Sequence, residues 1–389
     1  MRYQTLITAI CFVSAASAQN NAAETAVHPH FRSARPAPVI TDAGGPPFET
    51  PPSLACLYKL VPNPVPGCPV LGTSELPTGG QGIIAVVNAY DYPNAAHDLN
   101  VFSRQFGVPE CNTANPCFKR VYSNGKPSRV DGLWAANAAD VIEYAHAYAP
   151  KATIILIETP TGTIGDLLDG VRYANGIISM SPLGKGSVIM AFGAPESTSD
   201  TTFDMVFHTP GVIYISGNQG APGFLEYPAT SPYVLALGGT SVLRDDQGLF
   251  RAEIATSFWS GGPSEMESRP AFQDSIQNIV HTQRGVPDIG FCSDPIHGAQ
   301  IFYDSIELDG FVGWQYTGNV GFAEAAWAAI ISLAGNTAPD SQGELALLYS
   351  HMGDNTMRDI VFGQAFGVHA TPGWDFLTGI GVGIGLSGK

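Results

Sequence analysis

The chain has 389 residues, enough for one large α/β domain with a substantial core. Only 13% of its residues are charged, about half the ~25% of an ordinary soluble domain. The net charge of −16 argues against nucleic acid or an anionic membrane surface as a partner, because both require clustered Lys and Arg.

Residues 1–18 have the pattern of an export signal. Arg2 precedes an apolar core from Leu6 to Val13, and small residues follow up to Gln19. No later segment contains the ~18 uninterrupted apolar residues of a membrane span. We therefore expect a secreted protein, extracellular or periplasmic, without a membrane span and monomeric.

Residues 19–52 are rich in Pro, Ala and polar side chains and show no periodicity, which predicts a loose N-terminal arm. His28 and His30 could touch a metal ion, but two ligands on such an arm are too few to predict a metal site. The main domain is expected to span residues 53–389.

Five cysteines remain once the signal is removed with Cys11. Oxidation is expected outside the cytosol, and two pairs each close a short loop: Cys56 with Cys68 and Cys111 with Cys117. Cys292 is left unpaired, and its apolar surroundings predict a buried small side chain. A catalytic cysteine is the alternative, for which His297 is the nearest candidate partner.

From residue 82 onward, apolar runs typical of buried parallel strands alternate with helical segments. This alternation predicts a doubly wound parallel sheet. The expected strands are 82–90, 152–157, 187–191, 212–216 and 233–237, and the expected helical segments are 97–106, 134–148, 164–173 and 203–208.

Residues 311–331 combine an aromatic-ended strand, a break at Gly318 and an Ala-rich helix too apolar for the surface. Such a strand, turn and buried helix can mount a nucleophile above an α/β sheet. The stretch resembles the nucleophile segment of the sedolisins, serine-carboxyl peptidases with a subtilisin-like fold, whose pattern is Gly-Gly-Thr-Ser-(small)3-Pro-hydrophobic-Trp-Ala. When the two are aligned on Trp327-Ala328, Gly321 stands at the nucleophilic Ser and Ala325 at the Pro.

The acid pair of the family is a Glu and an Asp four residues apart on one helix, where they share a face. The Glu acts as general base toward the Ser, and the Asp orients it. The flanking anchors Trp134-Ala135 and Ala145-His146-Ala147 align without a gap. Asn137 then holds the Glu position and Val141 the Asp position, while Asp140 is one residue out of register and turned by about 100°.

The fourth family residue is an oxyanion-hole Asp in a pattern like Ala-Ser-Gly-Asp-Ser-Gly. Residues 215–220 resemble that motif and place Asn218 there, and an Asn amide can donate to an oxyanion. Ser241, in Gly239-Thr240-Ser241, is expected to be structural because the polar, turn-like residues 242–248 after it cannot form a buried helix.

Two C-terminal segments, 357–363 and 371–381, resemble the calcium site of the sedolisins. Ca²⁺ prefers hard oxygen ligands, six or more of them. The resemblance implies a site made by the side chains of Asp359 and Asp375 and the carbonyl oxygens of Ile360, Thr371 and Gly373.

The resemblance covers about residues 53–381 and implies a subtilisin-like α/β fold with a central buried helix. Because all four catalytic positions are substituted, we expect a secreted, calcium-binding homologue that no longer cuts peptides but could bind peptides or proteins in the former cleft. The alternative is an active acid-pH hydrolase with a site rebuilt from Asp140, Glu324 and Asn218. The contacts of Glu324 distinguish the two interpretations. A Glu324 side chain that faces the cleft favours the hydrolase, whereas one that is paired or capped elsewhere is structural.

Overall fold

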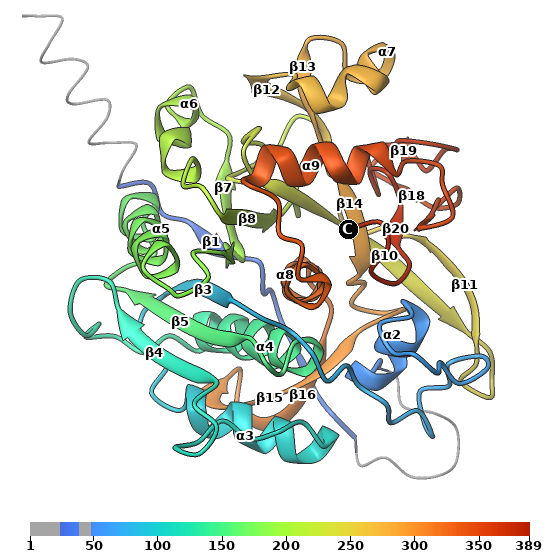
Figure 1. The fold of residues 1–389 in the computed structure, drawn as a ribbon. Helices are drawn as coiled ribbons and strands as arrows, with labels where there is room; N and C mark the ends of the chain where they lie inside the picture. The colour runs from blue at the N-terminus through green and yellow to red at the C-terminus, as the bar shows by residue number, and fades with distance from the viewer. Residues whose placement is uncertain (1–23, 39–47) are drawn as a thin grey trace, which may run out of the picture.

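The computed structural model describes residues 24–38 and 48–389, so the segment with the export-signal pattern lies outside the described residues. A mainly parallel sheet forms the centre of the molecule, with the strand order β17-β20-β14-β10-β8-β6-β3-β5-β4 and β11 paired to β10 (Figure 1). The bounds of its strands are β3 Ile83–Ala89, β4 Phe118–Tyr122, β5 Thr153–Thr159, β6 Gly186–Ile189, β8 Val212–Gly217, β10 Leu235–Arg244, β11 Phe250–Ala255, β14 Ile289–Cys292, β17 Met357–Arg358 and β20 Val382–Gly383.

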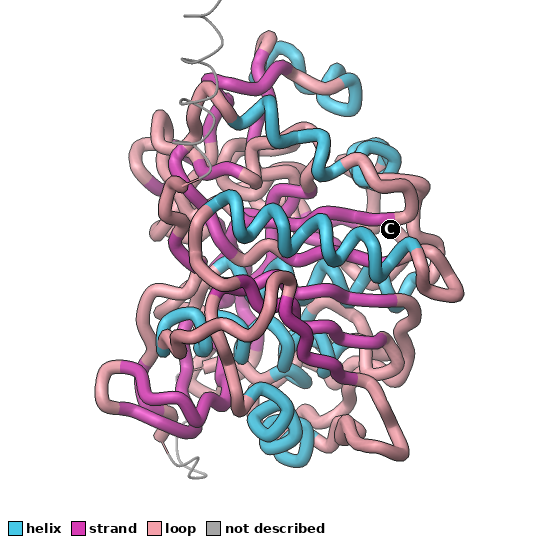
Figure 2. Tube along the Cα trace, turned by 90° about the vertical axis from the view of Figure 1, so that its left-hand side faces the viewer, coloured by secondary structure: helices cyan, strands magenta, loops and turns pink. Residues whose placement is uncertain are grey.

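Helices cover both faces of this sheet, as the view in Figure 2 shows. The predicted doubly wound α/β architecture is thereby confirmed. The helices are α2 Pro51–Leu57, α3 Ala95–Phe106, α4 Gly132–Tyr148, α5 Ile164–Ser179, α6 Asp200–Phe203, α7 Gln277–Val280, α8 Val320–Ala334 and α9 Ser341–Ser350, with 3₁₀ turns η1 Asp204–Phe207 and η2 Ala271–Ile276.

The strands are apolar on both sides because each side faces a separate core. Ile84 and Val86 of β3 join the core that contains α4 and α8, whereas Ala85 and Val87 join the core against α5. Alternating residues of one strand point to opposite faces, so a continuous apolar run fits a strand buried on both.

Helix α8 is the central buried helix that the sequence predicted. Every residue from Val320 to Ser332 is buried. Asn319 caps the N-terminus by accepting a hydrogen bond from Gly321 N–H, and Gly335 ends the helix in the left-handed conformation. Strand β8 ends close to α8, because a Cβ on Gly217 would lie 2.2 Å from Cγ1 of Val320.

The strand that precedes α8 belongs to a separate antiparallel sheet, β15-β16-β2, rather than to the central sheet. The chain therefore enters α8, and reaches the nucleophile position, from this smaller antiparallel sheet. The strands outside the central sheet are β1 His28–Pro29, β2 Arg35–Pro36, β7 Phe192–Pro195, β9 Glu226–Tyr227, β12 Gly262–Ser268, β13 Gln283–Val286, β15 Gln300–Leu308, β16 Phe311–Thr317, β18 Gln364–Ala365 and β19 Val368–His369.

The two predicted disulfides, Cys56–Cys68 and Cys111–Cys117, are present. Cys292 is a free, buried cysteine, and burial raises the pKa of its thiol well above the ordinary value. Its Sγ lies 3.4 Å from the carbonyl oxygen of Gly298 rather than against an imidazole.

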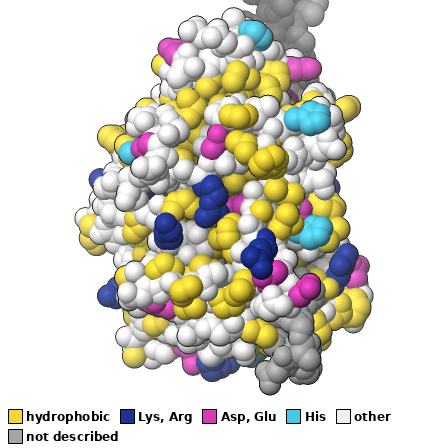
Figure 3. All heavy atoms as spheres, turned by 90° about the vertical axis from the view of Figure 1, so that its right-hand side faces the viewer, with side chains coloured by type: hydrophobic (Ala, Val, Ile, Leu, Met, Phe, Trp, Pro, Cys, Tyr) yellow, Lys and Arg dark blue, Asp and Glu magenta, His cyan; other side chains and the backbone are white. Residues whose placement is uncertain are grey.

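On the face shown in Figure 3, Lys and Arg side chains are scattered among acidic and hydrophobic ones and form no continuous basic patch. None of the helices in the described part of the chain combines the length and the apolar character needed to cross a membrane.

Candidate active-site cleft

The four positions that align with the catalytic residues of the sedolisins come together where α4, α8 and the end of β8 meet. Asn137 and Val141 lie one turn apart on α4, Asn218 directly follows β8, and Gly321 lies in the first turn of α8. A Cβ on Gly321 would lie 3.3 Å from Cγ2 of Val141. A pocket of about 340 Å³ is lined in part by Gln219, the residue after Asn218, and by Thr317 and Gly318, but by none of the four positions themselves.

The space in front of Gly321 is occupied by its own helix cap. Oδ1 of Asn319 accepts a hydrogen bond of 2.7 Å from Gly321 N–H, and a Cβ on Gly321 would lie 2.7 Å from that same oxygen. Nδ2 of Asn319 in turn donates to Oδ2 of Asp140 at 2.7 Å. A side chain on Gly321 could enter only if this cap moved.

Asn137 is engaged on both sides of its amide. Its Nδ2 donates to Oδ1 of Asn88 at 3.2 Å, and its Oδ1 accepts from the backbone N–H of Phe31 at 3.1 Å. An amide cannot take up a proton as a carboxylate does, so this side chain offers no general base.

The amide of Asn218 is also committed to the protein. Its Nδ2 donates to the carbonyl oxygen of Ser260 at 2.9 Å, while its Oδ1 accepts from Glu226 N–H at 3.1 Å. These two contacts fix the orientation of the amide and use one of its two N–H donors. Ser241, the other serine weighed from the sequence, lies on β10 and donates to Oδ2 of Asp294 at 2.5 Å.

Asp140 and Glu324 both lie near the site, and both are completely buried. Burial raises the pKa of Asp140 well above the ordinary value, although the hydrogen bond from Asn319 opposes the shift. Oε1 of Glu324 accepts two hydrogen bonds of 2.7 Å, one from Nδ1 of His30 and one from Gly217 N–H. Glu324 is therefore paired.

His30 lies between two glutamates. Its Nδ1 contacts Glu324, and its Nε2 lies 3.6 Å from Oε2 of Glu226 on β9. Burial alone would lower the pKa of His30, but the two carboxylates outweigh it and raise the pKa to about 9. Burial would raise the pKa of Glu226, yet hydrogen bonds from His28 and His30 hold it below its ordinary value.

The two histidines belong to residues 26–37, which we call the cleft segment. The sequence predicted a loose arm over residues 19–52, but the described residues of this segment are paired with the body over much of their length. His28 and Pro29 pair antiparallel with β7, and Arg35 and Pro36 pair with β16. In Figure 1 this segment is drawn in blue and carries the label β1.

Backbone hydrogen bonds fix the middle of the cleft segment against the candidate site. His30 N–H donates to the carbonyl oxygen of Ala191 at 3.0 Å, and a Cβ on Gly321 would lie 3.7 Å from Cβ of Ala191. Farther along, Nε of Arg32 donates to Oε1 of Gln219, the residue after Asn218. The segment thus passes beside the four aligned positions.

The contribution of His30, Glu226 and Asn319 was not foreseen from the sequence. Two histidines on a Pro-rich stretch were noticed, but their partners lie about 200 and 300 positions away, and no local pattern connects them. Only the fold brings these residues together.

The five residues aligned with the calcium site are also brought together. Gly373 N–H donates to Oδ2 of Asp359 at 2.8 Å, and Thr371 N–H donates to Oδ2 of Asp375 at 3.0 Å. The carbonyl oxygens of Ile360, Thr371 and Gly373 accept no hydrogen bond from the described residues. The neighbouring Arg358 pairs with Glu253, and neither aspartate has a cationic partner among residues 24–38 and 48–389.

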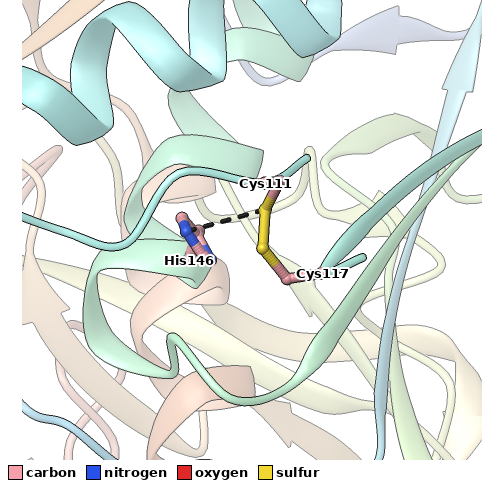
Figure 4. Close-up of side chains that lie close together, drawn as sticks. All are labelled: Cys111, Cys117 and His146. Atoms are coloured by element: carbon pink, nitrogen blue, oxygen red, sulfur yellow. Dashed lines mark hydrogen bonds between the residues drawn. A yellow bond between two sulfur atoms is a disulfide. The ribbon is translucent and has the colours of Figure 1, made fainter. Parts of the chain in front are cut away.

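A second group with metal-ligand chemistry lies at the far end of α4. Cys111, Cys117 and His146 meet there, and Figure 4 shows the bond between the two sulfur atoms with His146 beside it. His146 Nε2 lies 2.8 Å from the carbonyl oxygen of Pro109. With both sulfurs in a disulfide, the thiolates that a metal would need are absent.

Two curated proteins are similar to this chain over a large share of its length. Sedolisin from Pseudomonas sp. (strain 101) is 23% identical over 359 residues, which is 82% of this chain and 59% of that protein. Kumamolisin from Bacillus sp. (strain MN-32) is 24% identical over 285 residues, which is 63% of this chain and 48% of that protein. The chain therefore spans about half to three-fifths of these relatives. No protein-family model matches it.

Solved structures show the same fold. Pseudomonas sedolisin, a serine-carboxyl proteinase complexed with two molecules of pseudo-iodotyrostatin, matches with a TM-score of 0.67 and 17% identity over 86% of this chain and 95% of that one. A psychrophilic protease, S41, matches with a TM-score of 0.53 and 16% identity over 86% of this chain and 98% of that one. The subtilisin-like fold expected from the sequence is thereby confirmed.

Proposed function

Because the chain is a member of the sedolisin family with a subtilisin-like fold, we propose that it is a homologue of the serine-carboxyl peptidases that does not cut peptides. Its former cleft would bind a peptide rather than hydrolyse it. The observation that carries the proposal is the state of the nucleophile position, where Gly321 has no side chain and the cap oxygen of Asn319 fills the adjoining space.

The other three positions support the same proposal. Asn137 and Asn218 are amides whose polar atoms are bonded within the protein, and Val141 is apolar. Loss of the nucleophile alone costs a serine protease about 10⁶ in turnover. Here the base and the orienting carboxylate are replaced as well, so no residual triad is left to act.

The alternative, a hydrolase rebuilt from Asp140, Glu324 and Asn218, finds no support in their contacts. Asp140 is bonded to a helix cap, and Glu324 is bonded to His30 and to a backbone N–H. Asn218 donates its amide to Ser260. Each of these groups is committed to a contact that positions the chain.

We also propose that Asp359 and Asp375, with the carbonyl oxygens of Ile360, Thr371 and Gly373, bind Ca²⁺. Two carboxylates without a cationic partner and three carbonyl oxygens without a described donor match the hard oxygen ligands that Ca²⁺ takes. The ion would join two loops near the C-terminus and stabilise the folded state. Export and a monomeric state complete the proposal, and the two disulfides are compatible with export.

A peptidase assay tests the main proposal. The purified protein is incubated with a mixture of peptides at steps from about pH 3 to pH 8, with Pseudomonas sedolisin as the positive control, and the products are measured by mass spectrometry. We expect no cleavage at any pH. Cleavage that purifies with the protein and disappears in the Asp140→Asn or Glu324→Gln variant would establish the rebuilt hydrolase instead.

A further inference from the structure

The cleft segment is held by the kind of contacts that hold a bound peptide. It adds an antiparallel strand to β7, and His30 N–H and Val27 N–H donate to carbonyl oxygens of the body at 3.0 and 2.8 Å. Proteins commonly bind peptides in this way, by adding a strand to the edge of a sheet. None of these contacts requires that the segment be covalently joined to the body.

One side chain of the cleft segment is completely buried between two carboxylates. His30 is fully buried, Glu324 lies on one side of it and Glu226 on the other. His28 and Arg32 contact Glu226 only from the rim, where their side chains are 37% and 58% exposed. If His30 were replaced by a neutral side chain, Glu324 would lose its cationic partner inside the protein, which is costly.

A hydrophobic contact follows directly after this anchor. Phe31 is fully buried and packs edge-to-face against Phe302 with ring centroids 5.6 Å apart. Its backbone N–H donates to Asn137, the residue at the former general-base position. The segment is therefore recognised through its backbone, a buried imidazole and a buried ring in sequence.

We propose that the surface that holds the cleft segment is a peptide-binding groove with a preference for a histidine-sized cationic side chain followed by an aromatic one, and that the cleft segment is its built-in ligand. The groove is formed by β7, Asn137, Glu226, Phe302 and Glu324. Glu226 and Glu324 are the residues that set the preference. The inference rests on the proposed function, because it places a retained peptide rather than a substrate in the cleft.

Covalent attachment keeps the built-in ligand in place. A tethered ligand competes at an effective concentration on the order of millimolar, so a free peptide of the same sequence is largely excluded from the intact chain. Weakening the tethered segment alone should open the groove to that free peptide.

The test uses a fluorescein-labelled synthetic peptide with the sequence of residues 24–38, and fluorescence anisotropy measures its binding to two full-length chains. We expect the His30→Ala chain to bind the peptide, and the unmodified chain to bind it at least about 10-fold more weakly because its groove is filled. In the peptide itself, His30→Ala should weaken binding by roughly 100-fold or more, since it leaves a buried carboxylate unpaired. The matched peptide change His28→Ala should cost less than about 10-fold, because His28 lies at the exposed rim.

A second protein keeps the test decisive if the His30→Ala chain does not fold. The recognition sequence of a site-specific protease is inserted within residues 39–47 of the otherwise unchanged chain, and the chain is cut after purification. The N-terminal fragment should then co-elute with the body in gel filtration and exchange with the labelled peptide over time. The proposal is overturned if the fragment separates at once and the peptide does not bind, or if the His30→Ala peptide binds as well as the original.

Mass spectrometry of the recovered peptide separates the two proposals. Intact peptide with binding supports both. Cleaved peptide would refute the loss of peptidase activity while leaving the binding preference in place, and unbound intact peptide would refute only the built-in ligand.

Discussion

The Nδ1 atom of His30 and the Oε1 atom of Glu324 lie 2.7 Å apart, and this contact joins two fully buried residues that are 294 positions apart in the sequence. Glu324 is the single charged residue of helix α8. This contact holds the cleft segment against the position that aligns with the general base of the sedolisins, where Phe31 N–H donates to Asn137.

Loss of this contact should destabilise the whole protein. Removing one partner of a buried ion pair leaves the other charge unpaired and costs about 3–5 kcal/mol. We expect the His30→Ala variant to lose a free energy of unfolding in that range, measured by urea denaturation. The His28→Ala variant serves as the control and should lose less than about 1 kcal/mol, because that side chain is 37% exposed. Equal losses in the two variants would contradict the importance assigned to the buried contact.

Stability should fall as the pH rises from 5 to 9. Burial raises the pKa of several carboxyl groups, among them Asp200 and Asp204 to about 6, Glu158 and Asp304 to about 7, and Glu267 to about 8. These groups titrate near pH 4 when unfolded, so between about pH 4 and 8 the folded state binds more protons than the unfolded state. Their contribution is complete below pH 4 and is lost as the pH passes through their folded pKa values.

Deprotonation of His30 also lowers the stability of the folded state as the pH rises, but at higher pH than the carboxyl groups. Its pKa of about 9 lies above the unfolded value of about 6.5, so its contribution is complete below about pH 6.5 and is lost toward pH 9. Melting temperatures at pH 5, 7 and 9 measure the combined effect, and we expect the highest value at pH 5. A melting temperature that increases from pH 5 to pH 9 would contradict this assignment of pKa values.

The fold was predictable from the sequence because it depends on local periodicity. The apolar strands, the buried helix after Gly318 and the two short disulfide loops each have a local pattern, and the structure contains them all. The contacts of the cleft were not predictable in this way. His30, Glu226 and Asn319 meet through the tertiary fold, and a Pro-rich segment without periodicity gives no sign that it pairs with strands far away in the sequence.

The proposed calcium site predicts a stability that depends on the metal. Binding to the folded state alone stabilises it by mass action, so a chelator should lower the melting temperature of the protein as purified. The Asp375→Asn variant should melt lower from the start and be insensitive to the chelator. Identical melting curves with and without the chelator would remove calcium from the proposal.

The thiol of Cys292 should be unreactive in the folded protein. Cys292 is fully buried, and burial raises the pKa of its thiol, so little thiolate forms and no reagent reaches it. Alkylation followed by mass spectrometry should label Cys292 only in denaturant, while the pairs Cys56–Cys68 and Cys111–Cys117 remain oxidised. Rapid labelling under native conditions would instead indicate a reactive thiol.

Restoring the nucleophile alone should give no activity. In the Gly321→Ser variant the new Cβ lies 2.7 Å from Oδ1 of Asn319, so the helix cap must shift, and we expect a loss of about 1–3 kcal/mol in the free energy of unfolding. The serine would also lack a base, because Asn137 cannot accept its proton. Thermal melts and the peptide assay measure these two effects, and peptide cleavage by this single variant would show that some other group serves as the base.

The full family set should restore cleavage, and opening the cleft should make that cleavage faster. The variant Asn137→Glu, Val141→Asp, Asn218→Asp and Gly321→Ser regains the base, the orienting carboxylate, the oxyanion residue and the nucleophile, and we expect acid-pH hydrolysis from it. Since the cleft segment contacts the Asn137 position and lies beside Gly321, the same variant with His30→Ala should cleave a free peptide faster than the variant with His28→Ala. Equal rates in these two proteins would mean that the segment does not block the cleft, even if the chemistry itself returns.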